Sequence, residues 1–271
     1  MTNQRERAQR FRELHRPGTP LVLLNAWDAA SARIFEEAGA PAIATTSAGL
    51  ANALGYPDGD AIKPELVADA VRHITRVVRI PLSVDLESGY GSTPATVAAN
   101  VKAVIDAGGI GINIEDRLEN PRLLVDKISA IREVAAAADV PLFINARTDA
   151  YLRGRGDATA LFEDALHRLK TYEQAGADGL FAPGIADLEA IAQLVGALSL
   201  PLNVMAFQGV PPVAELARAG VARVSVGSGP MRATLGLARR IAKDVLATGT
   251  YGSFVDAPSH GEINSLFARR E

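Results

Sequence analysis

Several residue types are scarce or missing in this chain, and each absence narrows the chemistry open to it. There is no cysteine among the 271 residues, which excludes disulfides, thiolate metal sites and a cysteine nucleophile. Histidine is also rare, and its four copies are scattered: His15, His73, His167 and His260. We expect solvent-facing or packing roles for all four.

Long apolar runs and one-sided charge are missing as well. No run approaches the ~18 apolar residues that indicate a membrane-spanning helix, and the start, Met-Thr-Asn-Gln-Arg-Glu-Arg, is too polar for a signal peptide. The 28 Lys and Arg against 31 Asp and Glu give a net charge of -3, with no long run of one sign. This balance argues against nucleic acid as the main partner. We expect a cytoplasmic protein without a membrane or nucleic-acid partner.

What the chain does contain is a repeated pattern of strands. Hydrophobic residues make up 48% of it, enough for a substantial core. Pro-Leu followed by an apolar strand recurs at Pro20, Pro81, Pro141 and Pro201. A helix that ends at Ala-Gly before another strand recurs at Gly39, Gly108, Gly176 and Gly220. Proline suits the first residue of a strand, and glycine suits the residue just past a helix. The two types alternate, which predicts eight strands.

Amphipathic helices separate these strands. Apolar stripes at i, i+3, i+4 spacing run through 67–78, 97–105 and 161–172. Short strands alternating with helices imply right-handed crossovers and a parallel sheet, and eight such units in about 250 residues match a (β/α)8 barrel. We therefore predict an α/β protein, a single-domain TIM barrel over 20–248, after an amino-terminal helix within 1–19 and before a tail over 249–271. A doubly wound open sheet is the alternative.

Charged residues concentrate at the carboxyl ends of the predicted strands, where the chemistry of such barrels lies. Asp85 and Glu87 follow one strand and, two residues apart, point to one face. Glu115 ends the next strand. Without cysteine, these hard oxygen ligands favour Mg²⁺ or Mn²⁺ over zinc. Mg²⁺ keeps several waters, so one direct carboxylate is enough. The alternative is that some of these acids only cap the following helices.

Other strand ends could bind an anion. Arg147 offers a planar fork to a carboxylate or phosphate, or else pairs with Asp149 or a neighbouring acid. The small-residue turn 45–49 is either an anion nest or a loop without a ligand. Gly-Ser-Gly at 227–229 is similar to the barrel phosphate site after strand eight, or is a turn with a serine cap. Asp28 has the position of a helix N-cap.

Five stretches share their residues and their order with a known family. They are LNAWDAAS at 24–31, YPD at 56–58, VDLESGYG at 84–91, IED at 114–116 and ARTD at 146–149. In these stretches the chain resembles the isocitrate lyase/phosphoenolpyruvate mutase superfamily. The resemblance implies a barrel in which Mg²⁺ holds a 2-oxo acid or its enolate while a C–C or P–C bond breaks or forms.

The resemblance also implies roles, position by position, for the acids and the arginine. Asp85 would be the direct metal ligand, and Glu87 and Glu115 would complete the metal site through bound waters. Asp58 would hold a metal-bound water as well. Arg147 would bind the substrate, so that Arg147, Asp58 and Glu115 form the expected catalytic set.

The rest of the site and the assembly follow from the same resemblance. Thr46, with the backbone of Ser47 and Ala48, would hold the carboxylate or phosphonate of the substrate beside Arg147. The final helix is often exchanged between subunits in this superfamily, which implies a homo-oligomer, a dimer or a tetramer. Apolar residues after Pro230 agree with such an exchange: Leu235, Leu237, Ile241, Val245 and Leu246.

Three departures separate the chain from the lyases of this superfamily. Those lyases carry Lys-Cys-Gly-His shortly after the Ile-Glu-Asp strand, and its cysteine donates a proton. Here a shorter segment without cysteine, Arg-Leu-Glu-Asn-Pro-Arg, occupies 117–122. Position 87 is Glu where many relatives have Asp, and Gly184 stands where lyases have Glu. We therefore do not expect a true isocitrate or methylisocitrate lyase.

The prediction is a Mg²⁺-dependent lyase or phosphonomutase-like enzyme that acts on a small 2-oxo acid or phosphonate through an enolate. The first alternative is a non-catalytic or regulatory barrel that binds an enolpyruvyl-type metabolite, because the expected proton donor is missing. The second is a phosphosugar enzyme that uses the Gly-Ser-Gly turn at 227–229.

Overall fold

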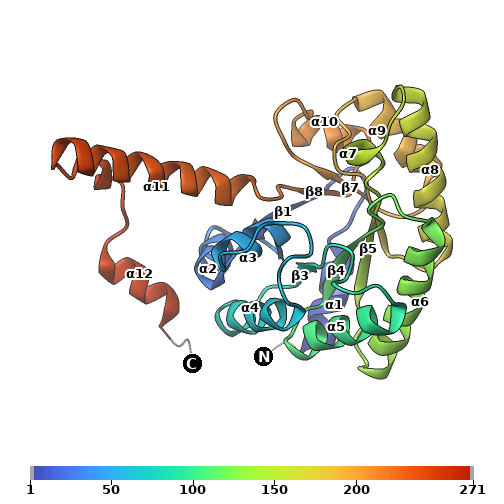
Figure 1. Ribbon diagram of the computed structural model, residues 1–271, viewed down its shortest axis with the longest axis horizontal. Helices are drawn as coiled ribbons and strands as arrows, with labels where there is room; N and C mark the ends of the chain where they lie inside the picture. Colours follow the sequence, from blue (N-terminus) through green and yellow to red (C-terminus); the bar gives the residue numbers. More distant parts are fainter. Residues whose placement is uncertain (1–2, 269–271) are drawn as a thin grey trace.

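A closed barrel of eight parallel strands forms the centre of the computed structural model, which describes residues 3–268 (Figure 1). Each strand pairs with the next along the chain, and β1 pairs with β8. The strands are β1 Leu21–Ala26, β2 Ile43–Thr45, β3 Leu82–Asp85, β4 Gly111–Glu115, β5 Phe143–Arg147, β6 Gly179–Phe181, β7 Leu202–Met205 and β8 Arg223–Ser225. All eight lie where the two alternating strand-start patterns predict them, so the (β/α)8 prediction is confirmed.

The helices lie on the outside of the barrel and over its ends. They are α1 Gln4–Glu13, α2 Ala29–Glu37, α3 Ser47–Ala53, α4 Pro64–Val77, α5 Pro94–Asp106, α6 Pro121–Ala137, α7 Ala150–Arg153, α8 Ala158–Gln174, α9 Leu188–Ala197, α10 Val213–Arg218, α11 Gly229–Thr248, the 3₁₀ turn η1 Gly252–Phe254 and α12 His260–Phe267. Within residues 3–268, every helix is too short or too polar to span a bilayer.

Local sequence explains where these helices start and which side they bury. Proline begins α4, α5 and α6, at the position where a helix has no use for the missing N–H. Asp28 caps α2 as predicted, because its carboxylate accepts the Ser31 N–H at 2.6 Å. Val67, Val71 and Ile74 of α4 are buried, which confirms the predicted apolar stripe.

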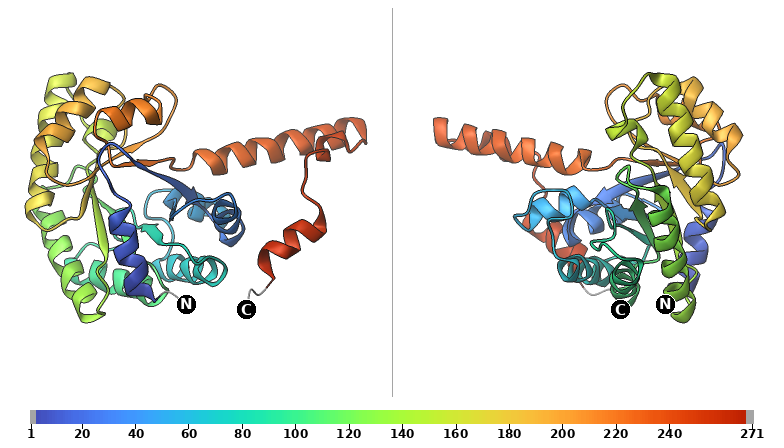
Figure 2. Two further views of the ribbon diagram at one scale, coloured as in Figure 1. Left: turned by 180° about the vertical axis from the view of Figure 1, so that it is seen from behind. Right: turned by 45° about the vertical axis from the view of Figure 1, so that its right-hand side comes forward.

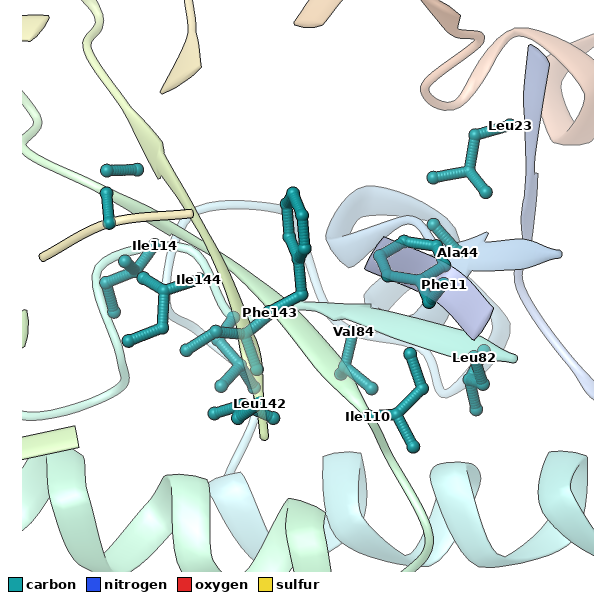
Figure 3. Close-up of a cluster of buried hydrophobic side chains, with 14 of the residues drawn as sticks. Phe11, Leu23, Ala44, Leu82, Val84, Ile110, Ile114, Leu142, Phe143 and Ile144 are labelled. Carbon is teal, nitrogen blue, oxygen red and sulfur yellow. The ribbon is translucent and has the colours of Figure 1, made fainter. Parts of the chain in front are cut away.

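Aromatic side chains close the amino-terminal end of the barrel. Phe11 of α1 is buried and meets Phe143 of β5 edge to face, with 5.4 Å between ring centroids (Figure 3). Gly111 makes room for it, since a Cβ there would lie 3.2 Å from the Phe11 ring. His15 stacks on Phe143 at 4.2 Å, and burial lowers its pKa to about 3, so it packs as a neutral ring.

The predicted roles of the histidines are therefore confirmed. His15 has a packing role, and the other three are exposed: His73, His167 and His260.

The carboxy-terminal helices leave the barrel. In both figures α11 projects away from the strands, and α12 turns back toward α2 (Figures 1 and 2). There Arg33 of α2 donates from Nε to the Leu266 carbonyl at 2.8 Å. The side chains of Leu235 and Leu246 on α11 are 54% and 87% exposed. The apolar surface expected after Pro230 is thus present on α11, where Leu235, Leu237 and Leu246 are exposed. α11 is not the last helix, because α12 lies within the predicted tail.

Candidate active site

Asp85 lies at the carboxyl end of β3 and has one free carboxylate oxygen. Its backbone N–H donates to Thr45 Oγ1 at 2.9 Å, and its Oδ2 accepts the Ser47 N–H at 3.1 Å. Its Oδ1 is buried and has no hydrogen-bond partner in the protein. Buried polar atoms nearly always have a partner, and an exception calls for an explanation such as an ion.

Glu87 is close to Asp85, although the geometry differs from the prediction. We expected both acids on one strand, but β3 ends at Asp85 and Glu87 lies in the next turn with a φ of 50°. This left-handed conformation is unusual for a residue with a side chain. The turn closes because the Gly89 N–H donates to the Leu86 carbonyl. The carboxylates converge through this turn, not through strand alternation.

The surroundings of Glu87 hold its carboxyl in place and change its acidity. Tyr90 donates its hydroxyl to Glu87 at 3.2 Å, and the Asp60 N–H donates to the other oxygen. Burial raises the pKa of Glu87 to about 7, and the negative charges of Asp60, Asp58 and Asp85 add to this rise. Glu87 can therefore gain or lose a proton near neutral pH.

Glu115 and Arg147 end the neighbouring strands β4 and β5 and form an ion pair of 2.7 Å. Arg147 also contacts Asp149 at 2.7 Å, and its guanidinium lies over the Phe181 ring at 5.8 Å. Burial raises the pKa of Glu115, and the charge of Arg147 opposes that rise. The ion pairs considered for Arg147 are thus formed, and substrate contact by the same side chain stays a prediction.

The loops around the strand ends place the remaining predicted residues. Asp58 is exposed, and it affects the site through its charge on Glu87. Thr46 caps α3, with Ser47 and Ala48 in its first turn next to Asp85. The Ser47 N–H predicted to bind the substrate donates to Asp85 in this structure.

Asp60, two residues beyond Asp58, has a larger part in the site than sequence reasoning gave it. Its carboxylate accepts the Ser88 hydroxyl at 2.6 Å and pairs with Arg117, while its backbone N–H holds Glu87. The motif Tyr-Pro-Asp drew attention to Asp58. The sequence feature that could have pointed to Asp60 is the second acid in Asp58-Gly59-Asp60.

The Gly-Ser-Gly turn before α11 differs from a phosphate site. The N–H groups of Val226 and Gly227 both donate to Asn25 Oδ1, at 3.0 and 2.9 Å. Ser228 occupies the N-cap position, but its side chain makes no capping hydrogen bond. The two backbone donors are therefore used within the protein, and the serine cap considered from the sequence is not formed.

Asp116 joins the loops behind these acids. It is buried, and its carboxylate accepts the Tyr172 hydroxyl at 2.7 Å and the N–H groups of Asp149 and Leu118 at 3.0 Å. Arg117 and Leu118 follow in left-handed conformations, with φ of 49° and 60°. This is the loop in which the sequence resemblance expects the cysteine segment of the lyases, and Asp116 fixes its start.

Comparison with known proteins decides the family. The model of the family described as phosphoenolpyruvate phosphomutase matches residues 11–246. This chain belongs to that family. The 2-methylisocitrate lyase of Escherichia coli K12 is 31% identical, over 90% of this chain and 88% of its own. A Mycobacterium tuberculosis H37Rv protein described as uncharacterized is 38% identical, over 87% of this chain and 88% of its own.

Solved structures agree with this membership in the phosphoenolpyruvate phosphomutase family. A Burkholderia cenocepacia J2315 protein, provisionally described as a lyase or mutase, is 37% identical with a TM-score of 0.90, and covers 99% of this chain and 98% of its own. An oxaloacetate acetylhydrolase bound to 3,3-difluorooxalacetate has a TM-score of 0.86 over 96% of this chain and 92% of its own. At 23% identity it shows the fold alone.

The acids of this phosphoenolpyruvate phosphomutase family member fit a hydrated divalent cation. Within residues 3–268, no three His, Asp or Glu side chains stand close enough together to ligate one ion directly. Mg²⁺ usually keeps several waters and takes one or two protein carboxylates. The free, buried Oδ1 of Asp85 fits a direct ligand, and Glu87 and Glu115 nearby fit acceptors for metal-bound waters.

A pocket of about 520 Å³ opens beside the Glu87 turn. Its lining joins the loops after β2, β3 and β4, and includes Asp60, Lys63, Tyr90, Arg117 and Lys127. Lys127 also donates to the Ser88 carbonyl at 2.8 Å, which holds the turn from behind. The pocket adjoins the Glu87 turn through Ser88 and Tyr90, but its lining includes neither Asp85 nor Glu115 nor Arg147.

Proposed function

We propose that this protein is a cytoplasmic, Mg²⁺- or Mn²⁺-dependent enzyme of the lyase or phosphonomutase type, acting on a small 2-oxo acid or phosphonate. The observation that carries the proposal is the unpartnered, buried oxygen of Asp85 at the carboxyl end of the barrel. It lies among acids, in a chain whose family includes both mutases and relatives named 2-methylisocitrate lyase. The reaction would make or break a C–C or P–C bond through an enolate.

A bound divalent cation would supply Lewis-acid polarisation of the 2-oxo group of the substrate. Asp85 would hold the ion directly, while Glu87 and Glu115 would accept hydrogen bonds from its waters. Asp58, on the exposed loop beside Glu87, would hold a further water. Each of these roles uses an acid that the fold brings to one end of the barrel.

Arg147 would orient the substrate. Its Nε and Nη2 are fixed by Asp149, so its position is set before a ligand arrives. Its Nη1, now on Glu115, is the donor that would turn to a substrate carboxylate. Once Nη1 has turned to the substrate, Glu115 would be free to accept a hydrogen bond from a metal-bound water. Thr46 and the Ser47 and Ala48 backbone would hold the second anionic group.

Metal-dependent turnover tests this function. The purified protein is incubated with oxaloacetate, 2-methylmalate-type acids and phosphonopyruvate, with Mg²⁺ and with EDTA. We expect turnover of at least one compound that needs Mg²⁺ and is lost in Asp85→Asn. The matched control is Asp139→Asn, because Asp139 pairs with Arg5 on the exposed surface far from the strand ends. If no compound is turned over in a metal-dependent way, the enzyme proposal is wrong.

A second candidate is a barrel that binds an enolpyruvyl-type metabolite without converting it. The loop at 117–122 carries no cysteine, and its Arg117 is paired with Asp60, so no proton donor of the lyase kind stands there. Calorimetry with oxalate, which mimics an enolate, separates the two. Tight binding that needs Mg²⁺, without turnover on the whole panel, favours this candidate.

We also propose a homo-oligomer, a dimer or tetramer, that exchanges α11. Apolar side chains are exposed both on α11 and on the barrel wall, at Val22 of β1 and Ile34 of α2. The α11 helix of a second copy would pack on Val22 and Ile34 of the barrel, and this packing would also bury the apolar side chains of that helix. Light scattering at micromolar concentration checks this, and a monomeric mass would contradict it.

A further inference from the structure

A polar layer crosses the barrel interior next to Asp85 and one inward-facing position before Glu115. Aliphatic side chains usually fill such interiors, yet Asn113, Asn145 and Arg223 meet here: Asn113 Oδ1 accepts from Asn145 at 2.9 Å and from Arg223 Nη2 at 3.1 Å. β8 and β4 lie on opposite sides of the barrel, so the Arg223 side chain must run through its interior. Asn113 is also the register partner of Asp85.

Arg223 carries a charge that no acid contacts. Its side chain is 0% exposed, and its Nε and Nη1 have no partner in the protein. Among residues 3–268 no carboxylate lies within ion-pair distance of it. Burial lowers its pKa to about 9, and the charge of Asp85 opposes that change. The guanidinium lies over the Phe11 ring, 6.0 Å from its centroid, which compensates the charge only weakly. A buried charge with so little compensation is costly, so a negative charge in the interior is expected to balance this guanidinium at neutral pH.

The unpartnered polar atoms of Arg223 and Asp85 are complementary, because the first are donors and the second is an acceptor. Arg223 has two unpartnered N–H donors, and Asp85 has one unpartnered acceptor, Oδ1, next to Asn113 in the sheet register. Asn203, the register neighbour of Arg223, also has unpartnered amide atoms, and so offers further polar contacts. A separate small anion would have to lie close to the negative charge of Asp85. The pairing of opposite charges within the chain is therefore favoured.

We propose that Arg223 is the buried counter-charge of Asp85 and acts as a positioning residue for the site. It stabilises the acidic end of β3 when no cation is bound, acting across the low-dielectric interior directly or through water. Its positive charge also lowers the affinity of the site for a divalent cation. This second effect rests on the proposed metal site, whereas the first does not.

A double-mutant cycle in EDTA tests the counter-charge without any metal. Urea unfolding is measured for the wild type, Arg223→Met, Asp85→Asn and the double variant. Asp85→Asn should destabilise the wild type, because Arg223 then loses its counter-charge. In the Arg223→Met background it should be neutral or stabilising. We expect a coupling of at least five-fold in the unfolding equilibrium constant, and equal effects in both backgrounds would overturn the proposal.

Arg33→Met is the matched control for this cycle. Arg33 is also buried and has an unpartnered Nη2, but it pairs with Glu36 on the outer helix α2. Asp85→Asn should lower the free energy of unfolding by the same amount in the Arg33→Met background as in the wild type. If Arg223→Met does not fold, the double variant should recover folding, and failure of both would overturn the proposal.

Calorimetry with Mg²⁺ alone tests the second effect. Arg223→Met should bind Mg²⁺ at least three-fold more tightly than the wild type, and Arg223→Lys, which keeps the charge, should bind it like the wild type. A purely structural role would leave the affinity unchanged or weaken it, and either result would overturn this part. If the wild type binds no Mg²⁺, the proposed function fails, while the cycle in EDTA still decides the pairing of Arg223 with Asp85.

Discussion

The two ends of the barrel differ in the charge and the hydrogen bonding of their buried polar groups. At the amino-terminal end, His15 lies between aromatic rings and burial keeps it neutral. At the carboxyl end, Asp85 keeps an unpartnered oxygen and Glu87 has a pKa of about 7 in a left-handed turn. The first end is optimised for packing, and the second keeps charge and strain that a ligand can relieve. Mutations at the amino-terminal end should therefore change mainly stability, whereas mutations at the carboxyl end should change metal binding most.

The largest effect on stability should come from the aromatic end. Phe11→Ala removes a ring that is completely buried against Phe143. We expect a loss of about 3–5 kcal/mol in the free energy of unfolding, with little change in Mg²⁺ affinity of the folded protein. Urea unfolding and calorimetry measure the two, and Phe11→Leu should lose much less. A large fall in Mg²⁺ affinity would mean that the ends are not independent.

The largest effect on metal binding should come from Asp85. Asp85→Asn removes the direct ligand, and we expect a loss in Mg²⁺ affinity of about 100-fold or more. Glu87→Gln should lower the Mg²⁺ affinity by about 10-fold, which is in the range for groups that hold a metal ligand or a metal-bound water in place. Calorimetry measures both. Equal losses would show that Glu87, too, contacts the ion directly.

The raised pKa of Glu87 predicts how stability depends on pH in EDTA. The folded state holds a proton at Glu87 up to about pH 7, whereas the unfolded chain releases it near the ordinary carboxyl pKa of 4.5. The contribution of Glu87 to stability should therefore fall as pH rises from about 4.5 to 7. Glu115, whose pKa burial raises to about 8, acts in the same direction, and His15, whose pKa burial lowers to about 3, acts in the opposite one. The difference in urea midpoint between the wild type and Glu87→Gln, measured at several pH values, isolates the Glu87 slope, and a difference that does not change with pH would contradict it. Mg²⁺ affinity should rise over the same interval, because the ion needs the ionised acid.

The smallest effect should come from an acid with a structural role at the same end. Asp28 follows β1 and caps α2. Asp28→Ala should cost about 1 kcal/mol of stability and leave Mg²⁺ affinity unchanged. Urea unfolding and calorimetry check both values. A clear change in Mg²⁺ affinity would place Asp28 in the site and not only at a helix end.

The fold could be predicted because its signals are local. Proline at strand starts and glycine after helix ends act on the backbone of their own residues, so their alternation located all eight strands. The position of Glu87 could not be predicted in this way. It depends on where β3 stops, and that is set by the turn from Leu86 to Gly89 and by pairing with β4.

The site residues that sequence reasoning missed depend on tertiary contacts. Asp60 gains its importance from Ser88, Arg117 and Glu87, which lie far along the chain. Arg223 lies in the apolar stretch Val-Ala-Arg-Val-Ser, and the sequence alone would place its charge on the outside of the strand. Only barrel closure shows that this side chain runs inward to Asn113.

The aromatic contact at the base also orders events during synthesis. Phe11 is made near the start of the chain, but its partner Phe143 opens the fifth strand. Until the ribosome has released that strand, α1 can contact only earlier parts of the chain, such as the Ile105 and Gly109 carbonyls that accept from Gln4. The first helix of the nascent chain can therefore complete its packing only once β5 is available, in line with the slow formation of contacts that are distant in sequence.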